Sequence, residues 1–243
     1  MKPNANLSLP CCLIGGLLLA QSLHAGIVFT IENPGVQATT VPGAITETFD
    51  SLTPGPLTTY VSPGIGTFAG GTIVAANRYG GAGGTGNYYA VGSESGTTLG
   101  TLTLNSPQDY VGLWWSAGDR ENVLQFFDGA SLVGTFNVGN ILSLALSSSY
   151  FGNPNNRSLD PGEPFVYLDF TTTGGTQITS MDFENGLGTG FELDNVSVFG
   201  SPITPPGNAI PDATHTGLLF LIAAGALFGY RQTMRLPAEN RAN

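Results

Sequence analysis

Short runs in which hydrophobic and polar residues alternate fill the middle of the chain, separated by glycine, proline, asparagine and aspartate. A period of two puts successive side chains on opposite faces, as in strands that have one face against a core. The region has no sustained helical period, so the pattern predicts an all-β fold, an antiparallel sandwich or barrel. The expected strands cover residues 27–31, 44–49, 97–104, 110–115, 123–127, 132–136, 165–170, 178–183 and 190–199.

Two of these segments predict finer features. The sequence Asp128-Gly129 between two apolar runs predicts a β-hairpin with an Asp-Gly turn. In the last segment, 190–199, the alternation changes phase at Asp194-Asn195. A phase change inside one strand predicts a β-bulge, and bulges often re-aim a strand near a site.

The segment 26–200 is interpreted as one β-sandwich domain. Its glycine-rich stretch 80–87 predicts a surface loop rather than a dinucleotide fingerprint, because no βαβ unit surrounds it. Residues 152–162 predict a second long loop, and the proline-rich residues 201–209 predict a linker.

The N-terminus has the pattern of a secretory signal peptide. A basic second residue is followed by an apolar run at 13–20 and a polar stretch that ends in Ala25. Cleavage after Ala25 would remove residues 1–25 and with them Cys11 and Cys12, the two cysteines of the chain. We therefore expect no disulfide and no cysteine-based metal site in the mature protein.

Residues 210–243 have the pattern of a membrane anchor with a basic end. Their apolar run reaches from about 213 to 230, close to the roughly twenty residues that a spanning helix needs, and Arg231 follows it. The basic flank predicts a cytoplasmic C-terminus and an external domain. The alternative is a buried C-terminal helix of the globular domain.

This C-terminal region resembles the sorting tails of exosortase-dependent surface proteins, the PEP-CTERM group. The motif Ile210-Pro211-Asp212 is similar to the Val-Pro-Asp-Ser-Gly variant of that group, from which Ala213 and Thr214 depart. The resemblance implies export through the Sec translocon of a Gram-negative type bacterium and transient anchoring in the inner membrane. It also implies cleavage by an exosortase and a final position at the cell surface or outside the cell.

The domain between the two ends is strongly acidic. Of the 17 acidic residues only Asp212 and Glu239 lie outside residues 26–209, which leaves 15 against three arginines, a net charge of −12. Such a surface repels nucleic acid and anionic lipid, and it suits cations or neutral glycans. The two histidines lie in the predicted signal peptide and anchor, so a Ser-His-Asp triad and imidazole metal ligands are excluded for this domain.

Residues 44–199 resemble the jelly-roll surface domains that precede such tails, and carbohydrate-binding modules of the same type. The matching stretches are 48–50, 87–92, 111–115 and 191–198. The resemblance implies that the first and last strands lie side by side and that a structural Ca²⁺ sits there. Its candidate ligands are Glu47, Asp50, Glu192 and Asp194, while the alternative is that Asp50 and Asp194 accept hydrogen bonds from backbone N–H groups in turns.

The aromatic residues offer a second candidate site. Trp114 and Trp115 point to opposite faces of their strand, and Trp115 is expected inside because it alternates with hydrophobic residues. Trp114 and Tyr110 would then face outward and, with Tyr88 and Tyr89, could stack on sugar rings. The alternative is that both faces are covered, one by the second sheet and one by a loop.

Catalysis has weaker support. Glu192 and Asp194 resemble the acid pair of jelly-roll glycoside hydrolases, but Ser197 stands where that pattern has a further glutamate. The leading hypothesis is a non-catalytic exported protein whose β-sandwich associates with extracellular polysaccharide. A glycoside hydrolase that uses Glu192 and Asp194, or a structural spacer without a ligand, are the alternatives.

Overall fold

The computed structural model describes residues 26–144, 146–204 and 208–210. The predicted signal peptide (1–25), the membrane helix (213–230), the motif residues Pro211 and Asp212, and Arg231 lie outside these residues. Within the described ranges no helix has the length and apolar character to cross a bilayer.

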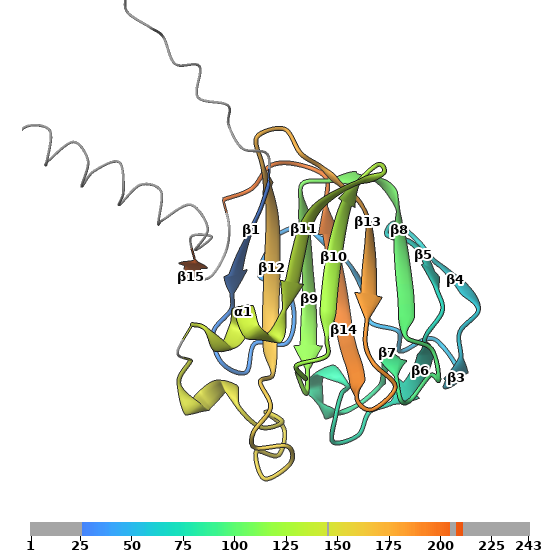
Figure 1. Ribbon diagram of the computed structural model, residues 1–243, viewed down its shortest axis with the longest axis vertical. Helices are drawn as coiled ribbons and strands as arrows, with labels where there is room; N and C mark the ends of the chain where they lie inside the picture. The colour runs from blue at the N-terminus through green and yellow to red at the C-terminus, as the bar shows by residue number, and fades with distance from the viewer. Residues whose placement is uncertain (1–25, 145, 205–207, 211–243) are drawn as a thin grey trace, which may run out of the picture.

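Two antiparallel sheets pack face to face, so the predicted all-β sandwich is confirmed (Figure 1). The larger sheet contains, in spatial order, β15 (Asn208–Ile210), β1 (Gly26–Ile31), β12 (Val166–Thr173), β9 (Tyr110–Ser116), β14 (Gly190–Phe199), β7 (Asn87–Gly92), β6 (Thr72–Ala75) and β3 (Gly55–Pro56), and β2 (Ile45–Glu47) pairs with β14. The smaller sheet contains β11 (Ser131–Asn137), β10 (Val123–Asp128), β13 (Ile178–Glu184), β8 (Leu99–Gln108), β5 (Gly66–Ala69) and β4 (Thr59–Ser62). Helical structure is confined to α1 (Val138–Leu142) and the 3₁₀ turns Ala82–Gly84 and Ser148–Tyr150 in the described residues.

The clearest sequence signals correspond to real elements. The predicted hairpin is the pair β10–β11, and β14 has the predicted bounds. The predicted strand at 44–49 pairs as β2 with β14, which places Glu47 opposite Val196. The predicted linker 201–209 ends in a strand, because Asn208–Ile210 pair with β1.

The strands between residues 55 and 92 were not predicted. They are two to six residues long, and the connections between them contain glycines with positive φ, such as Gly70 and Gly71. Gly66 lies so close to β8 that a Cβ there would overlap the Thr103 carbonyl oxygen. Glycine allows this close approach but also weakens the alternating pattern from which strands are recognised.

The core between the sheets is built from aromatic rings. Trp115 stacks on Phe191 with 4.3 Å between ring centroids and meets Phe136 edge-on, so its predicted inward position is confirmed. Phe170 contacts the rings of Phe126 and Phe136 from the opposite sheet. Full burial of each such ring contributes roughly 1.5–3 kcal/mol, so this interface holds the two sheets together.

The predicted β-bulge is present in β14. The register with β9 shifts between Asp194 and Ser197, and Asn195 has a left-handed backbone with φ of 47°. The Asn195 side chain donates from Nδ2 to the carbonyl oxygen of Gln37 at 2.6 Å. The bulge therefore also fastens the loop at residues 33–44 to the sheet.

We predict that Phe170→Ala lowers the free energy of unfolding by about 3–5 kcal/mol, because the cavity lies where both sheets meet. Phe127→Ala is the matched control: this ring is partly exposed on the outer face of β10, and its loss should cost about 1 kcal/mol or less. Urea denaturation measures both values. Equal losses would contradict the placement of Phe170 at the centre of the core.

Candidate functional site

The four aromatic residues expected at a glycan platform are buried. Trp114 is 1% exposed and Tyr110 is 0% exposed. Trp114 does lie on the face opposite Trp115, but it packs in a second cluster with Phe165 and Tyr167 under covering loops. The outward platform is therefore wrong, and the alternative in which both faces are covered is correct. Alternation predicts which face a side chain occupies but gives no information on whether a loop lies over that face.

Tyr88 and Tyr89 belong to strand β7 rather than to a loop, and both are fully buried. The Tyr88 hydroxyl donates to Asn77 Oδ1 at 3.2 Å. The Tyr89 hydroxyl donates to the carbonyl oxygen of Gly70 at 3.0 Å. Their polar ends are thus used inside the domain and do not reach a surface ligand.

Three of the four carboxylates predicted to bind calcium accept hydrogen bonds from the protein itself. Asp194 accepts from the Ala82 and Asn195 amides, each at 2.7 Å, and Asp50 accepts from the Asn87 amide at 2.9 Å. Glu47 accepts from one backbone amide and two hydroxyl groups, those of Phe49, Tyr60 and Ser62. Asp50 and Asp194 thus accept backbone amides, as the alternative expects. The Ala82 and Asn87 amides, however, belong to a distant segment of the chain rather than to a neighbouring turn.

Glu192 is separate from the other three carboxylates. It lies on the same outer face of β14 as Asp194, opposite Ser116, and it interacts electrostatically with Glu94 and Asp119. Within residues 26–204, so far as the structure describes them, no three His, Cys, Asp or Glu side chains are placed to hold one metal ion. The predicted set of four is therefore not assembled as a single site.

The outer face of the smaller sheet is the open surface of the sandwich, and its side chains form cross-strand rows. We call this surface the polar face. The backbone registers place Gln125, Asp182, Thr101, Ala69 and Thr59 in one row and Phe127, Ser180, Thr103, Thr67 and Val61 in the next. All ten side chains are exposed or half-buried. The polar face thus offers hydroxyl, carboxamide and carboxylate groups and one aromatic ring.

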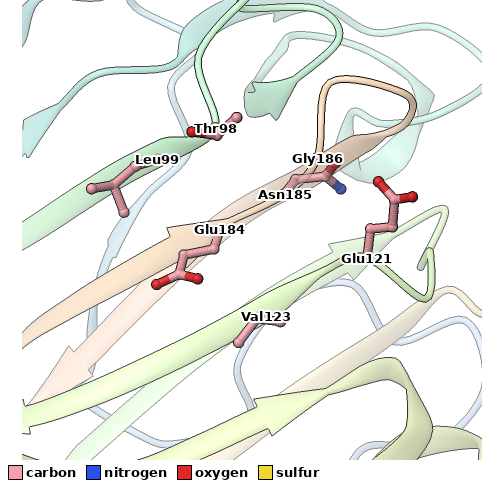
Figure 2. Close-up of a pocket in the computed structure, with 7 residues that line it drawn as sticks. All are labelled: Thr98, Leu99, Glu121, Val123, Glu184, Asn185 and Gly186. Carbon is pink, nitrogen blue, oxygen red and sulfur yellow. The ribbon is translucent and has the colours of Figure 1, made fainter.

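An open depression of about 460 Å³ lies at one end of the polar face (Figure 2). Glu184 reaches it from the end of β13 and Glu121 from the turn before β10, with Leu99 of β8 across from them. The Glu121 carboxylate lies close to Gly186, and a Cβ at residue 186 would overlap its Oε2. The complete lining is Thr98, Leu99, Glu121, Val123, Glu184, Asn185 and Gly186.

The depression combines acceptors with a buried amide donor that has no partner. Asn185 is buried, its Oδ1 accepts from the Thr189 hydroxyl at 3.2 Å, and its Nδ2 has no hydrogen-bond partner. A buried amide donor without a partner costs free energy that a ligand oxygen or a water molecule could recover. The lining contains no basic residue, so the depression suits a neutral or cationic polar ligand. The sequence signal for this depression is the segment Glu184-Asn185-Gly186 directly after a predicted strand, which alternation alone does not mark as a site.

A buried polar layer lies beneath the loop at residues 33–44, on the outer face of the larger sheet. Asp169 is 0% exposed, and its Oδ1 accepts from the Tyr110 hydroxyl at 2.6 Å while its Oδ2 has no partner. Burial raises the pKa of Asp169 to about 7, and the nearby Glu32 adds to the rise, whereas the Tyr110 hydroxyl opposes it. Burial likewise raises the pKa of Asp194 and that of Glu163 to about 7.

These raised pKa values predict that the domain is more stable at pH 5 than at pH 8. A carboxyl group that binds its proton more tightly in the folded state stabilises the fold at low pH, and this contribution disappears as pH rises toward 7. Asp169→Asn should remove part of the slope and raise stability at pH 8 by on the order of a few kcal/mol. Urea denaturation at both pH values measures the effect, and stability that increases from pH 5 to pH 8 would contradict it.

Comparison with known proteins yields no relative. No family model matches the chain, and neither a curated protein nor a solved structure is significantly similar to it.

Proposed function

We propose that the chain is an exported, non-catalytic surface or matrix protein whose β-sandwich associates with neutral extracellular polysaccharide through the polar face. The observation that carries this proposal is the contrast between the two outer surfaces. Loops cover the outer face of the larger sheet, whereas the polar face is open and presents groups that hydrogen-bond to sugar hydroxyls. A flat polar surface of this kind suits an extended chain better than a small molecule held in a closed pocket.

The charge of the domain supports a neutral glycan over an anionic one. In the described residues Arg78 pairs with Asp160, and Arg157 donates to the carbonyl oxygen of Ser149 at 2.7 Å. The rows of the polar face contain no arginine or lysine but do contain Asp182. A polyanion would meet repulsion there without a compensating ion pair.

The non-catalytic part of the proposal rests on the state of the candidate acid pair. A glycoside hydrolase needs both carboxyl groups beside the scissile bond. Asp194 binds two backbone amides and Glu192 is 2% exposed, and neither residue lines the depression. The hydrolase alternative therefore has less support than binding without catalysis.

The proposal includes a jelly-roll identity for the sandwich, a signal peptide at 1–25 and an exosortase-type tail at 210–243. The pairing of β2 with β14 supports the jelly-roll identity, because it brings an early strand and a late strand together. Cleavage after Ala25 would keep the described residues of β1, Gly26–Ile31, in the mature chain. The motif starts at Ile210, which is the last residue of β15.

The binding proposal predicts that Gln125→Ala combined with Asp182→Ala weakens retention on polysaccharide by at least about tenfold, because both groups are direct neighbours in the first row of the polar face. Native gels that contain the host's extracellular polysaccharide measure this as the protein's migration against polysaccharide concentration. Ile45→Thr is the control, since this residue is exposed on β2 in the other sheet. Unchanged migration of the wild-type protein would favour the spacer alternative, and release of reducing sugar would favour the hydrolase.

The sorting proposal predicts that a chain ending at residue 209 is exported but no longer retained at the cell surface. The apolar run and arginines that would anchor it are then missing. Fractionation of the cell envelope and medium, followed by immunoblotting, measures the distribution. Surface retention equal to that of the full chain would remove the basis for an exosortase-type tail.

A further inference from the structure

Carboxylates gather at one end of the sandwich without a positive partner. Glu94 lies in the turn between β7 and β8, Asp119 in the turn between β9 and β10, and Glu192 in β14. Asp119 interacts electrostatically with Glu94, and both act on Glu192. Among the described residues the one ion pair is Arg78–Asp160, so none of these three carboxylates is neutralised by a salt bridge. We call Glu94, Asp119 and Glu192 the end site.

Two of these carboxylates face each other over a glycine. A Cβ at Gly190 would overlap both Glu192 Oε1 and Glu94 Oε2. The two oxygen atoms therefore border the same small volume, which only a glycine at residue 190 leaves unfilled. Two carboxylates at such close range repel each other unless a proton or a cation lies between them.

Glu192 provides an independent indication that something binds there. Its side chain is directed into this acidic group, the residue is 2% exposed, and Oε2 is buried without any hydrogen-bond partner. The removal of a carboxylate oxygen from water without a partner costs several kcal/mol by typical values. This differs from Asp194 two residues later, whose oxygens accept backbone amides.

We propose that the end site binds a divalent cation of the calcium type, with Glu94 and Glu192 as its first two ligands and Asp119 as the third. Calcium accepts six to eight oxygen ligands in flexible geometry, so carboxylates on loops suit it well. Zinc prefers nitrogen and sulfur ligands, which the end site lacks. Two carboxylates are already in place, and Asp119 moves onto the ion from its turn. This movement explains why three ligands do not converge in the structure without the ion.

The end site is distinct from the calcium ligands expected from sequence, with which it shares only Glu192. It is also independent of glycan binding. Asp119 and Glu121 belong to the same turn, and Glu121 lines the depression. A bound cation would therefore link β14 to two turns and hold one wall of the depression in place.

The test uses the full-length chain freed of metal with EDTA and then titrated with Ca²⁺. We expect Ca²⁺ to raise the thermal midpoint by several degrees, because an ion that binds only the folded state stabilises it. Tb³⁺ should bind in place of Ca²⁺ with luminescence sensitised by tyrosine, since Tyr88 interacts electrostatically with Glu192. Competition by Ca²⁺ then gives its affinity.

Glu192→Gln and Glu94→Gln should each lower the Ca²⁺ affinity at least about tenfold. The half-exposed Glu94 provides a variant in which misfolding is not an issue. Glu184→Gln is the matched control, because it removes one carboxylate from the depression and leaves the end site intact. No Ca²⁺-dependent shift and no Tb³⁺ signal would overturn the proposal. An equal loss of Ca²⁺ affinity in Glu184→Gln would overturn the proposal as well. So would a loss of Ca²⁺ affinity in Asp50→Asn without one in Glu94→Gln.

Discussion

The bulge at Asp194-Asn195 is the constraint on which the exposed surfaces of this protein depend. It turns the Asp194 carboxylate toward the Ala82 amide and the Asn195 side chain toward the carbonyl oxygen of Gln37. Two loops from different parts of the chain are thereby held over the larger sheet, and they bury Trp114. Two residues of β14 therefore contribute directly to the difference between the covered face and the open one, together with the contact between the Thr39 and Tyr110 hydroxyl groups.

An acidic domain with three arginines and no lysine must stabilise most of its carboxylates by means other than salt bridges. Here backbone amides and hydroxyl groups take that role, as at Glu47, Asp194 and Asp169. Such bonds position loops and strands accurately, but they leave the negative charge in place. The residual charge makes burial costly at Glu192 and keeps polyanions away from the surface.

Sequence reasoning succeeded where side-chain period alone decides the outcome. The hairpin, the bounds of β14 and the phase change at the bulge all follow from alternation and turn chemistry. It failed for β3 to β7, whose short glycine-rich strands have little alternation, and for Trp114, whose burial depends on distant loops. Glu47 and Asp194 were recognised as unusual carboxylates, yet their hydrogen-bond donors could not be read from the chain. The polar face and the position of Glu94 beside Glu192 could be recognised only from the strand register and the fold.

The pairing of β15 with β1 has a consequence for the overall design. It places residues 208–210 directly beside residues 29–31, so both boundaries of the described domain lie on one edge of the larger sheet (Figure 1). Connections to preceding and following chain segments leave from this edge, while the polar face belongs to the other sheet. Neighbouring boundaries of this kind also permit circular permutation and insertion into a host protein. The sandwich is in this sense a module that can be attached at one edge while a broad face stays free.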